Sequence, residues 1–175
     1  MRYVFLVGLM GSGKTYWGRL LAQELNFSFV DTDELISHET SSSIAGLFAN
    51  KGEDHFRQLE TELLKHGLPD RDSVISTGGG MPCFHQNIDL MLEKGVVVWL
   101  APDLPTIAER IWRHKEKRPL IAHCEHLEEV VGKLQELQDR RTPYYSKADI
   151  VENEVVVDLP ALIRRIETVG KFAIR

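Results

Sequence analysis

The chain has 175 residues, of which 43% are hydrophobic and 27% are charged, so it is long enough for one well-buried core and too short for two ordinary domains. Its formal net charge of -5 argues against a surface that neutralises nucleic-acid phosphates, and its composition argues against disorder. We therefore expect residues 1–175 to form a single globular domain that does not bind nucleic acid.

The beginning of the chain and its cysteines bear on where the protein works. The first residues run directly into an apolar strand pattern, and no apolar stretch approaches the ~18 residues that a membrane helix needs. The two cysteines, Cys83 and Cys124, lack the C-x-x-C spacing of a zinc or redox site. We expect a cytosolic protein with free thiols and no membrane contact, and a monomer as the default for this size.

Short β-rich runs alternate with longer helical patterns along the chain. Strands are predicted at residues 3–7, 27–30, 74–77, 96–100 and either 150–151 or 155–157. Helices are predicted at residues 14–25, 44–50, 53–66, 105–113, 127–141 and 159–168. Because the strand runs are almost continuously apolar, both faces of the sheet should be covered by helices. The sequence therefore predicts an α/β fold, a three-layer α/β/α sandwich around a five-stranded parallel sheet.

The first strand is followed by a phosphate-binding motif. Residues 8–15 read G-L-M-G-S-G-K-T, which matches G-x-x-x-x-G-K-[ST] between a strand and a helix. Such a loop turns successive backbone N–H groups toward one point, and the helix N-terminus adds positive charge. Lys14 should bridge the β- and γ-phosphates, and Thr15 should hold Mg²⁺. The motif alone leaves GTPases, motor ATPases and kinases open.

Two aspartates follow the second strand, at the sheet edge where open α/β folds bind ligands. In an extended segment, Asp31 and Asp33 would point to the same side, one toward Mg²⁺ and one toward a substrate hydroxyl. Alternatively, one of them only caps a helix at residues 34–39. Both readings are compatible with a site at this edge.

Two further groups of residues suit an anionic acceptor. Arg57 and Glu60 are three apart on a predicted helix and share a face, although such a pair is usually surface decoration. Residues 78–80 are three glycines after the third strand, where the backbone can approach a ligand closely. The sequence thus predicts a second ligand-binding loop beside the phosphate loop.

Two basic segments complete the pattern. Residues 113–120 are either a solvated charge run or a mobile lid whose arginine stabilises charge on the transferring phosphoryl group. Arg140 and Arg141 stand at a predicted helix end, where they either offset the helix dipole or bind a carboxylate. The ligand-binding interpretation gives one anionic substrate two cationic partners.

Taken in order, these motifs resemble the shikimate kinase family from end to end. They are G-x-x-G-x-G-K-T at 8–15, D-x-D at 31–33, F-R-x-x-E at 56–60, G-G-G at 78–80, R-P-L at 118–120 and R-x-P-x-Y at 141–145. The resemblance implies a P-loop NTPase fold and transfer of the γ-phosphate of ATP to the 3-hydroxyl of shikimate with Mg²⁺, a step of chorismate and aromatic amino acid biosynthesis. The family also points to a monomer.

The resemblance implies a role for each matched position. The catalytic residues would be Lys14, Asp33 and Arg118. The nucleotide would be bound by Gly11, Ser12, Gly13, Lys14, Thr15, Tyr16 and Arg118. Shikimate would be bound by Asp33, Arg57, Gly79, Gly80 and Arg141. Thr15 would hold Mg²⁺ directly, and Asp31 would hold it through water.

Within the shikimate site, Arg57 and Arg141 would clamp the carboxylate, a geometry that suits guanidinium groups. Asp33 would meet the ring hydroxyls and could accept the proton of the attacking one. Arg118 would reach from the lid to the phosphate and the substrate. The acceptor region would span about 32–61 and the lid about 112–125. Ile44, Phe48 and Phe56 match the apolar side of the pocket, and Arg113 and Asn153 loosely match adenine contacts.

Three other functions fit part of the same pattern. A kinase for gluconate or another sugar acid would also pair a P-loop with arginines for a carboxylate. A GTPase switch is disfavoured because the chain lacks the N-K-x-D guanine signature. A catalytically inactive relative would have lost some of the motifs, whereas every matched catalytic position is intact here.

Overall fold

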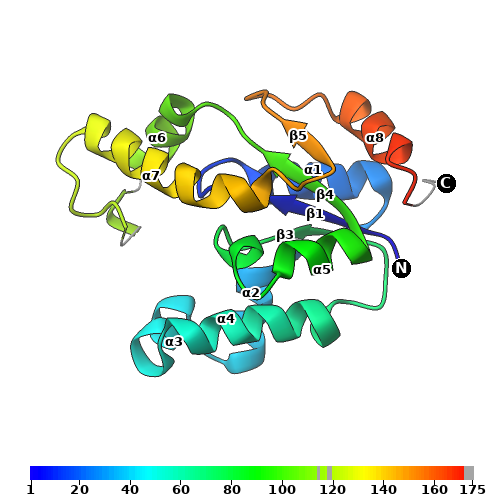
Figure 1. The fold of residues 1–175 in the computed structure, drawn as a ribbon, viewed down its shortest axis with the longest axis horizontal. Helices are drawn as coiled ribbons and strands as arrows, with labels where there is room; N and C mark the ends of the chain where they lie inside the picture. The colour runs from blue at the N-terminus through cyan, green and yellow to red at the C-terminus, as the bar shows by residue number, and fades with distance from the viewer. Residues whose placement is uncertain (114, 118–119, 172–175) are drawn as a thin grey trace.

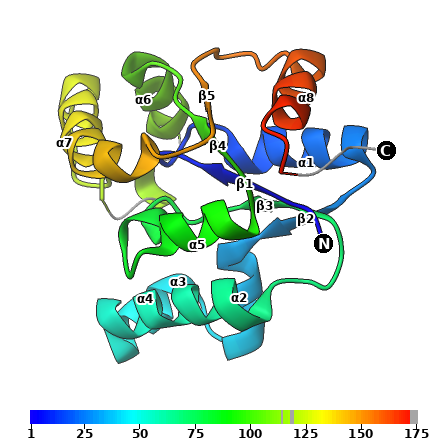
Figure 2. The same cartoon turned by 45° about the vertical axis from the view of Figure 1, so that its right-hand side comes forward.

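Five parallel strands form the centre of the protein, which was studied as a computed structural model that describes residues 1–113, 115–117 and 120–171. The strands are β1 (Tyr3–Val7), β2 (Ser28–Asp31), β3 (Ser73–Ser76), β4 (Gly95–Leu100) and β5 (Ile150–Glu152). Their order across the sheet is β2-β3-β1-β4-β5, and all pairs are parallel, so the α/β prediction is confirmed. Figure 1 labels β1, β3, β4 and β5 of this sheet, and Figure 2 labels all five strands. The fifth strand lies at the first of its two predicted places, and residues 155–157 form no strand.

Helices connect the strands. They are α1 (Lys14–Leu25), α2 (Thr32–Thr40), α3 (Ile44–Lys51), α4 (Glu53–Glu62), α5 (Asn87–Lys94), α6 (Leu104–Trp112), α7 (Leu127–Tyr145) and α8 (Leu159–Thr168). Shorter helical turns are the π-helix η1 (Leu63–Gly67) and the 3₁₀ turns η2 (Met81–Cys83) and η3 (Lys115–Lys117). No helix was predicted where α5 lies, although Ile88 and Met91 have helical spacing and are buried.

Each face of the sheet has its own apolar core, as the alternation of side chains along β1 requires. Val4 and Leu6 contribute to a core shared with α1 and α8. Phe5 and Val7 belong to a larger core that reaches α4, α5, α6 and α7. Figure 2 shows α1 and α8 together on one side of the sheet and α4 and α5 on the other. The three-layer arrangement therefore follows from the strand pattern.

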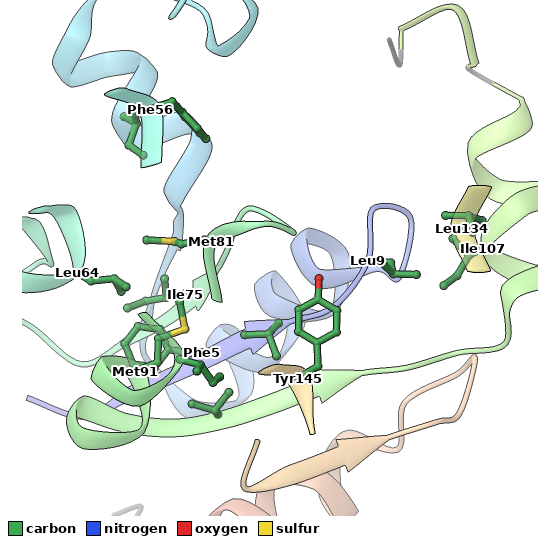
Figure 3. Close-up of a cluster of buried hydrophobic side chains, with 14 of the residues drawn as sticks. Phe5, Leu9, Phe56, Leu64, Ile75, Met81, Met91, Ile107, Leu134 and Tyr145 are labelled. Atoms are coloured by element: carbon green, nitrogen blue, oxygen red, sulfur yellow. The ribbon is translucent and has the colours of Figure 1, made fainter. Parts of the chain in front are cut away.

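The larger core also fixes the helices that carry functional residues. Figure 3 shows Ile107 of α6 beside Leu134 of α7, and Phe5 and Ile75 from the sheet beside Met91 of α5. All five side chains are buried. Burying a side chain of this size contributes about 1.5–3 kcal/mol to stability. The loops at the carboxyl ends of the strands are thus held on a rigid base.

The sheet order brings the functional loops to one edge. β1 pairs with β3 through Tyr3 and Ser73 and with β4 through Tyr3 and Gly95, so the chain reverses its direction of winding at β1. Open parallel sheets bind ligands at such a point, outside the carboxyl ends of the strands. Among the described residues, no helix is long and apolar enough to span a bilayer.

Candidate active site

A cavity of about 750 Å³ opens at the carboxyl edge of the sheet, where the phosphate loop, β2 and β3 end. It is lined by Met10, Gly11, Gly13, Lys14, Thr15, Tyr16, Trp17, Asp31, Asp33, Ser76, Thr77, Gly78, Gly79, Arg110, Val155 and Val156. Segments far apart in the sequence therefore meet in one place. Its volume suits a ligand of nucleotide size.

The phosphate loop has the backbone conformation that its glycines permit. Gly8 has φ 142° and a Cβ atom there would lie 2.5 Å from the Leu100 carbonyl oxygen, so only glycine fits. α1 begins at Lys14, and no side chain caps its N-terminus. Its first backbone N–H groups and helix dipole can therefore meet an anion in the cavity.

The Lys14 ammonium group lies over this loop. Its Nζ donates to the carbonyl oxygens of Gly8 at 2.9 Å and Leu9 at 2.8 Å. Four other predicted nucleotide residues, Gly11, Gly13, Thr15 and Tyr16, also line the cavity. The Ser12 side chain is buried away from it, so we expect Ser12 to contact a phosphate through its backbone N–H.

Thr15 and Asp31 fit the predicted Mg²⁺ position. The Thr15 hydroxyl donates to Asp31 Oδ2 at 3.0 Å, so a hydroxyl and a carboxylate oxygen lie together at the cavity. Mg²⁺ prefers such ligands and keeps several waters or phosphate oxygens besides one or two protein groups. No cluster of three or more acidic, histidine or cysteine ligands occurs in the described part of the chain. The two oxygens therefore fit an ion held mainly by phosphates and water.

Asp31 also caps α2, since its Oδ1 accepts a hydrogen bond from the Asp33 backbone N–H at 3.1 Å. The capping alternative is thus correct for Asp31 and does not exclude its place beside Thr15. The reason given for Asp33 was wrong, because Asp33 lies in the first turn of α2 and not in an extended segment. It still lines the cavity, since α2 begins directly where β2 ends.

The Asp33 carboxyl is in an unusual environment for an acid. Its Oδ1 is buried and has no hydrogen-bond partner among the described residues. Burial raises the pKa of Asp33, and the charge of Asp31 raises it further, while Lys14 and Arg57 act in the opposite direction. A carboxyl with a raised pKa and an unused oxygen is suited to accept a proton from a ligand hydroxyl.

Arg57 lies beside the three-glycine loop. A Cβ atom on Gly80 would lie 2.7 Å from Arg57 Nη1, so the guanidinium packs directly against the backbone there. The guanidinium is also 4.3 Å from the Phe84 ring centroid, with Phe48 and Phe56 within 5.8 Å. These rings form the apolar surroundings predicted for Phe48 and Phe56, and Ile44 packs against the same core.

Glu60 lies close to both Arg57 and Asp33. It is fully buried, and its Oε2 accepts from Arg57 Nη1 at 2.9 Å. Gly78 separates the two acids, because a Cβ atom there would lie 2.8 Å from Asp33 Oδ1 and 3.0 Å from Glu60 Oε1. Burial raises the pKa of Glu60 to about 7, although Arg57 opposes the shift. The Arg57–Glu60 pair is therefore part of the site and not surface decoration.

The raised pKa of Glu60 predicts a pH-dependent stability. From its ordinary value of 4.5 up to about 7, the native state holds a proton that the unfolded chain releases, so Glu60 stabilises the fold at low pH and loses this effect as pH rises. Between pH 5 and 7.5, the unfolding free energy of the wild type should fall relative to that of Glu60→Gln by up to about 3 kcal/mol. Urea unfolding at both values tests this, and parallel curves would contradict it.

The second predicted carboxylate ligand comes from the end of α7. A Cβ atom on Gly79 would lie 2.9 Å from Arg141 Nη1, so Arg141 reaches the three-glycine loop. Tyr145 donates from its hydroxyl to the Gly79 carbonyl oxygen, which holds this loop against α7. Arg140 instead points outward and pairs with Glu136. The structure thus places Arg141, and not Arg140, beside the loop.

The nucleotide end of the cavity differs from the prediction. Neither Arg113 nor Asn153 lines it, and both are exposed. Arg110 lines it instead, donating from Nη1 to the Gly11 carbonyl oxygen at 3.3 Å and from Nη2 to that of Val155 at 3.4 Å. Arg110 lies within α6, whereas Arg113 follows its last residue, Trp112.

Two further predictions concern the basic segment after α6. Arg118 lies outside the described residues, so its predicted contact with phosphate stays a prediction. In the described part of the segment, Lys115 Nζ donates to the Cys124 carbonyl oxygen at 2.6 Å, and Ile121 and Cys124 are buried. This part of the predicted lid is therefore packed against the protein.

Three comparisons agree with this geometry. Residues 10–160 match the sequence profile of the family described as "Shikimate kinase". A shikimate kinase from Persephonella marina is 40% identical over 150 residues, which cover 86% of this chain and 87% of that protein. The solved structure of a shikimate kinase from Acinetobacter baumannii in complex with shikimate superposes with a TM-score of 0.83 at 29% identity, covering 99% of this chain and 96% of that one.

Proposed function

The chain belongs to the shikimate kinase family, and from that premise we propose which of its side chains carry the reaction. The enzyme transfers the γ-phosphate of ATP to the 3-hydroxyl of shikimate, giving shikimate 3-phosphate and ADP in aromatic amino acid biosynthesis. One observation supports the residue assignment above all. Asp33, Arg57 and Arg141 surround the glycine loop at 78–80, which opens on the same cavity as the phosphate loop.

The cavity divides into a nucleotide half and an acceptor half. Residues 11–16 and Arg110 form the nucleotide half, where backbone N–H groups and Lys14 would hold the phosphates. The adenine base of ATP would lie toward Arg110 and Val155, at the end of the cavity away from the three-glycine loop. Asp33, Gly78 and Gly79 line the acceptor half, and Arg57 and Arg141 lie just beyond this lining, against Gly80 and Gly79 of the same loop. Phosphoryl transfer would then take place between Lys14 and Asp33, where the halves meet.

The acceptor half suits a ring that carries both hydroxyls and a carboxylate. Arg57 and Arg141 would bind the carboxylate, because guanidinium groups match its planar geometry. With the carboxylate fixed at one end, a ring hydroxyl would reach the buried oxygen of Asp33 at the other. This placement converts the attack on the γ-phosphorus into a step within one complex, which is the main contribution of a protein to phosphoryl transfer.

During transfer, Asp33 would accept the proton of the attacking hydroxyl, and Lys14 would neutralise charge on the equatorial phosphate oxygens. When bound, Mg²⁺ supplies positive charge to the β- and γ-phosphates, and Thr15 and Asp31 are the residues that would hold it. Arg118 remains the candidate for a further positive charge from the segment at 112–125. The protein forms no covalent intermediate in this scheme.

The activity itself is tested by measuring ADP release from MgATP with no acceptor and with shikimate, gluconate or a nucleoside monophosphate. We expect release with shikimate and a product heavier by one phosphoryl group. If ADP were released only with gluconate, the division of the cavity into two halves would stand, but the acceptor would be gluconate and not shikimate. ATP binding with no release for any acceptor would instead favour a switch or an inactive relative.

A substitution in the glycine loop tests the acceptor half alone. Gly80 has φ -85° and ψ -23°, which alanine adopts readily, so Gly80→Ala should fold normally. Its new methyl group would lie 2.7 Å from Arg57 Nη1 and push the guanidinium away. We expect the KM for shikimate to rise about tenfold and the KM for ATP to stay within about twofold, in steady-state assays.

Gly132→Ala is the matched control for Gly80→Ala, because nothing lies within 4 Å of the added methyl group on α7. It should leave both KM values unchanged. Equal rises in the two KM values for Gly80→Ala would show that the methyl group disturbs the whole cavity and would contradict the division into halves.

We also propose that the enzyme works in the cytosol as a monomeric, single-domain protein. Cys83 and Cys124 are both free thiols, which is the usual state of cysteines in a reducing compartment. Size-exclusion chromatography with light scattering tests the monomer. The acceptor region at 32–61 is supported by the placement of Asp33 and Arg57, and the lid at 112–125 stays a prediction.

A further inference from the structure

Arg57 already holds two carboxylates of its own helix. Its Nη1 donates to Glu60 at 2.9 Å, and its Nε and Nη2 donate to Glu53 Oε1 at 3.1 and 2.8 Å. A guanidinium has five N–H donors, and these contacts use three of them. The face of the group is covered by Gly80 and the Phe84 ring. A substrate carboxylate that binds Arg57 would therefore meet an arginine that already contacts Glu53 and Glu60.

The two carboxylates differ sharply in burial. The Glu60 side chain is 0% exposed, whereas the Glu53 side chain is 54% exposed. Removing Glu60 from Arg57 would leave a buried carboxyl without its partner, which is strongly unfavourable. Glu53 can turn into water at little cost, because exposed ion pairs contribute little to stability. Glu53 is thus the partner that can leave.

Charge favours this exchange. Glu53 and Glu60 both act to raise the pKa of Arg57 against the effect of burial. A substrate carboxylate would bring a further negative charge close to Glu53. Repulsion between carboxylates is relieved by releasing the exposed one, which also returns the Nε and Nη2 donors.

We propose that Glu53 is an internal competitor of the acceptor's carboxylate: it occupies Arg57 in the free enzyme and is displaced when shikimate binds. This inference rests on the proposed function of Arg57 as a carboxylate ligand. Glu53 thereby sets the apparent affinity for the acceptor, because part of the binding free energy is used to break an existing ion pair. It also keeps the guanidinium in place while the acceptor half is empty.

Glu53→Gln tests the competition. The amide keeps the size of the side chain but loses the charge, so shikimate should meet a less occupied Arg57. We expect the KM for shikimate to fall about two- to fivefold, the range that corresponds to an exposed ion pair, while kcat and the KM for ATP change less than about twofold. Calorimetric titration with shikimate alone should show the same tightening in Kd.

Asp54→Asn is the matched control. Asp54 is exposed in the same first turn of α4, and it makes no ion pair or side-chain hydrogen bond with any described residue. The control removes the same charge from nearly the same place, so any general effect of negative charge on an anionic substrate appears in both variants. Only the loss of the Arg57 contact is particular to Glu53→Gln.

The outcomes separate this inference from the proposed function. If the wild type fails to phosphorylate shikimate, the proposed function fails before the variants are compared. If the wild type is active but Glu53→Gln has an unchanged or higher KM for shikimate, or if Asp54→Asn lowers it equally, the competition is refuted and the function stands. Thermal unfolding of all three proteins should give equal midpoints within a few degrees, which shows that helix α4 is intact in each.

Discussion

Replacing Lys14 by alanine should lower turnover with shikimate and MgATP by at least ~10²–10³, while the protein still folds. The Lys14 ammonium lies over the phosphate loop, 2.9 and 2.8 Å from the carbonyl oxygens of Gly8 and Leu9. From there it can reach the oxygens of a bound triphosphate. The charge that it offers is worth more on the transferring group than on the substrate, so kcat should fall more than ATP affinity. Coupled ADP release measures the rate.

Lys94→Ala controls for the loss of one positive charge. Lys94 is exposed at the end of α5, outside the cavity, so its substitution should leave kcat unchanged. Thermal unfolding of Lys14→Ala should match that of the wild type within a few degrees. A variant that keeps more than about a tenth of wild-type turnover would remove Lys14 from the mechanism.

The phosphate loop and the parallel sheet could be predicted because their signals are local. The eight residues at 8–15 specify a turn, a helix start and a lysine within one stretch, and the bounds predicted for α1 agree with the structure. The apolar strands likewise indicate a parallel sheet without any knowledge of their partners. Sequence patterns therefore predict the part of the site that is built by one continuous segment.

The nucleotide end was predicted less well because it depends on distant contacts. Arg110 meets the carbonyl oxygen of Gly11, 99 residues earlier in the chain, and that of Val155, 45 residues later. Both arginines fall in the helix predicted at residues 105–113, so no local pattern distinguishes Arg110 from Arg113. Which arginine faces the cavity depends on how α6 packs against α7, and the sequence alone does not place these two helices relative to each other.

For the two arginines on α7, a usable signal was present in the sequence. Leu134 and Tyr145 are buried, and Arg141 lies seven residues after the first and four before the second. Residues at such spacings share one face of a helix, so Arg141 should point inward and Arg140 should not. Helical phase thus reaches the same assignment as the match to the family motif.

Asp33 was placed correctly for a reason that was wrong. The alternation argument required an extended segment, but the Asp31 carboxylate caps α2 and starts the helix at Thr32. Asp33 then enters the cavity from the first helical turn. A capping residue and a ligand residue two positions apart are therefore parts of the same local structure.

Asp33→Asn should lower turnover by about 10²–10⁴, the usual contribution of a general base, and leave the Kd for MgATP within about twofold. Aspartate and asparagine have nearly the same shape, so the cavity and its contacts with Gly78 should persist. Burial raises the pKa of Asp33, so wild-type kcat should fall as the pH drops below this raised value and the carboxyl takes up a proton. The residual activity of the variant should lack this acidic limb.

Asp31→Asn serves as the comparison because it changes the neighbouring carboxylate at Thr15 instead of the one at the acceptor. It should raise the Mg²⁺ concentration needed for half-maximal rate, whereas Asp33→Asn should not. If Asp33→Asn weakened ATP binding as severely as turnover, the two halves of the cavity would not be separate. If it kept high turnover with an unchanged pH profile, Asp33 would orient the hydroxyl without taking its proton, and the proton would leave through the phosphate or solvent.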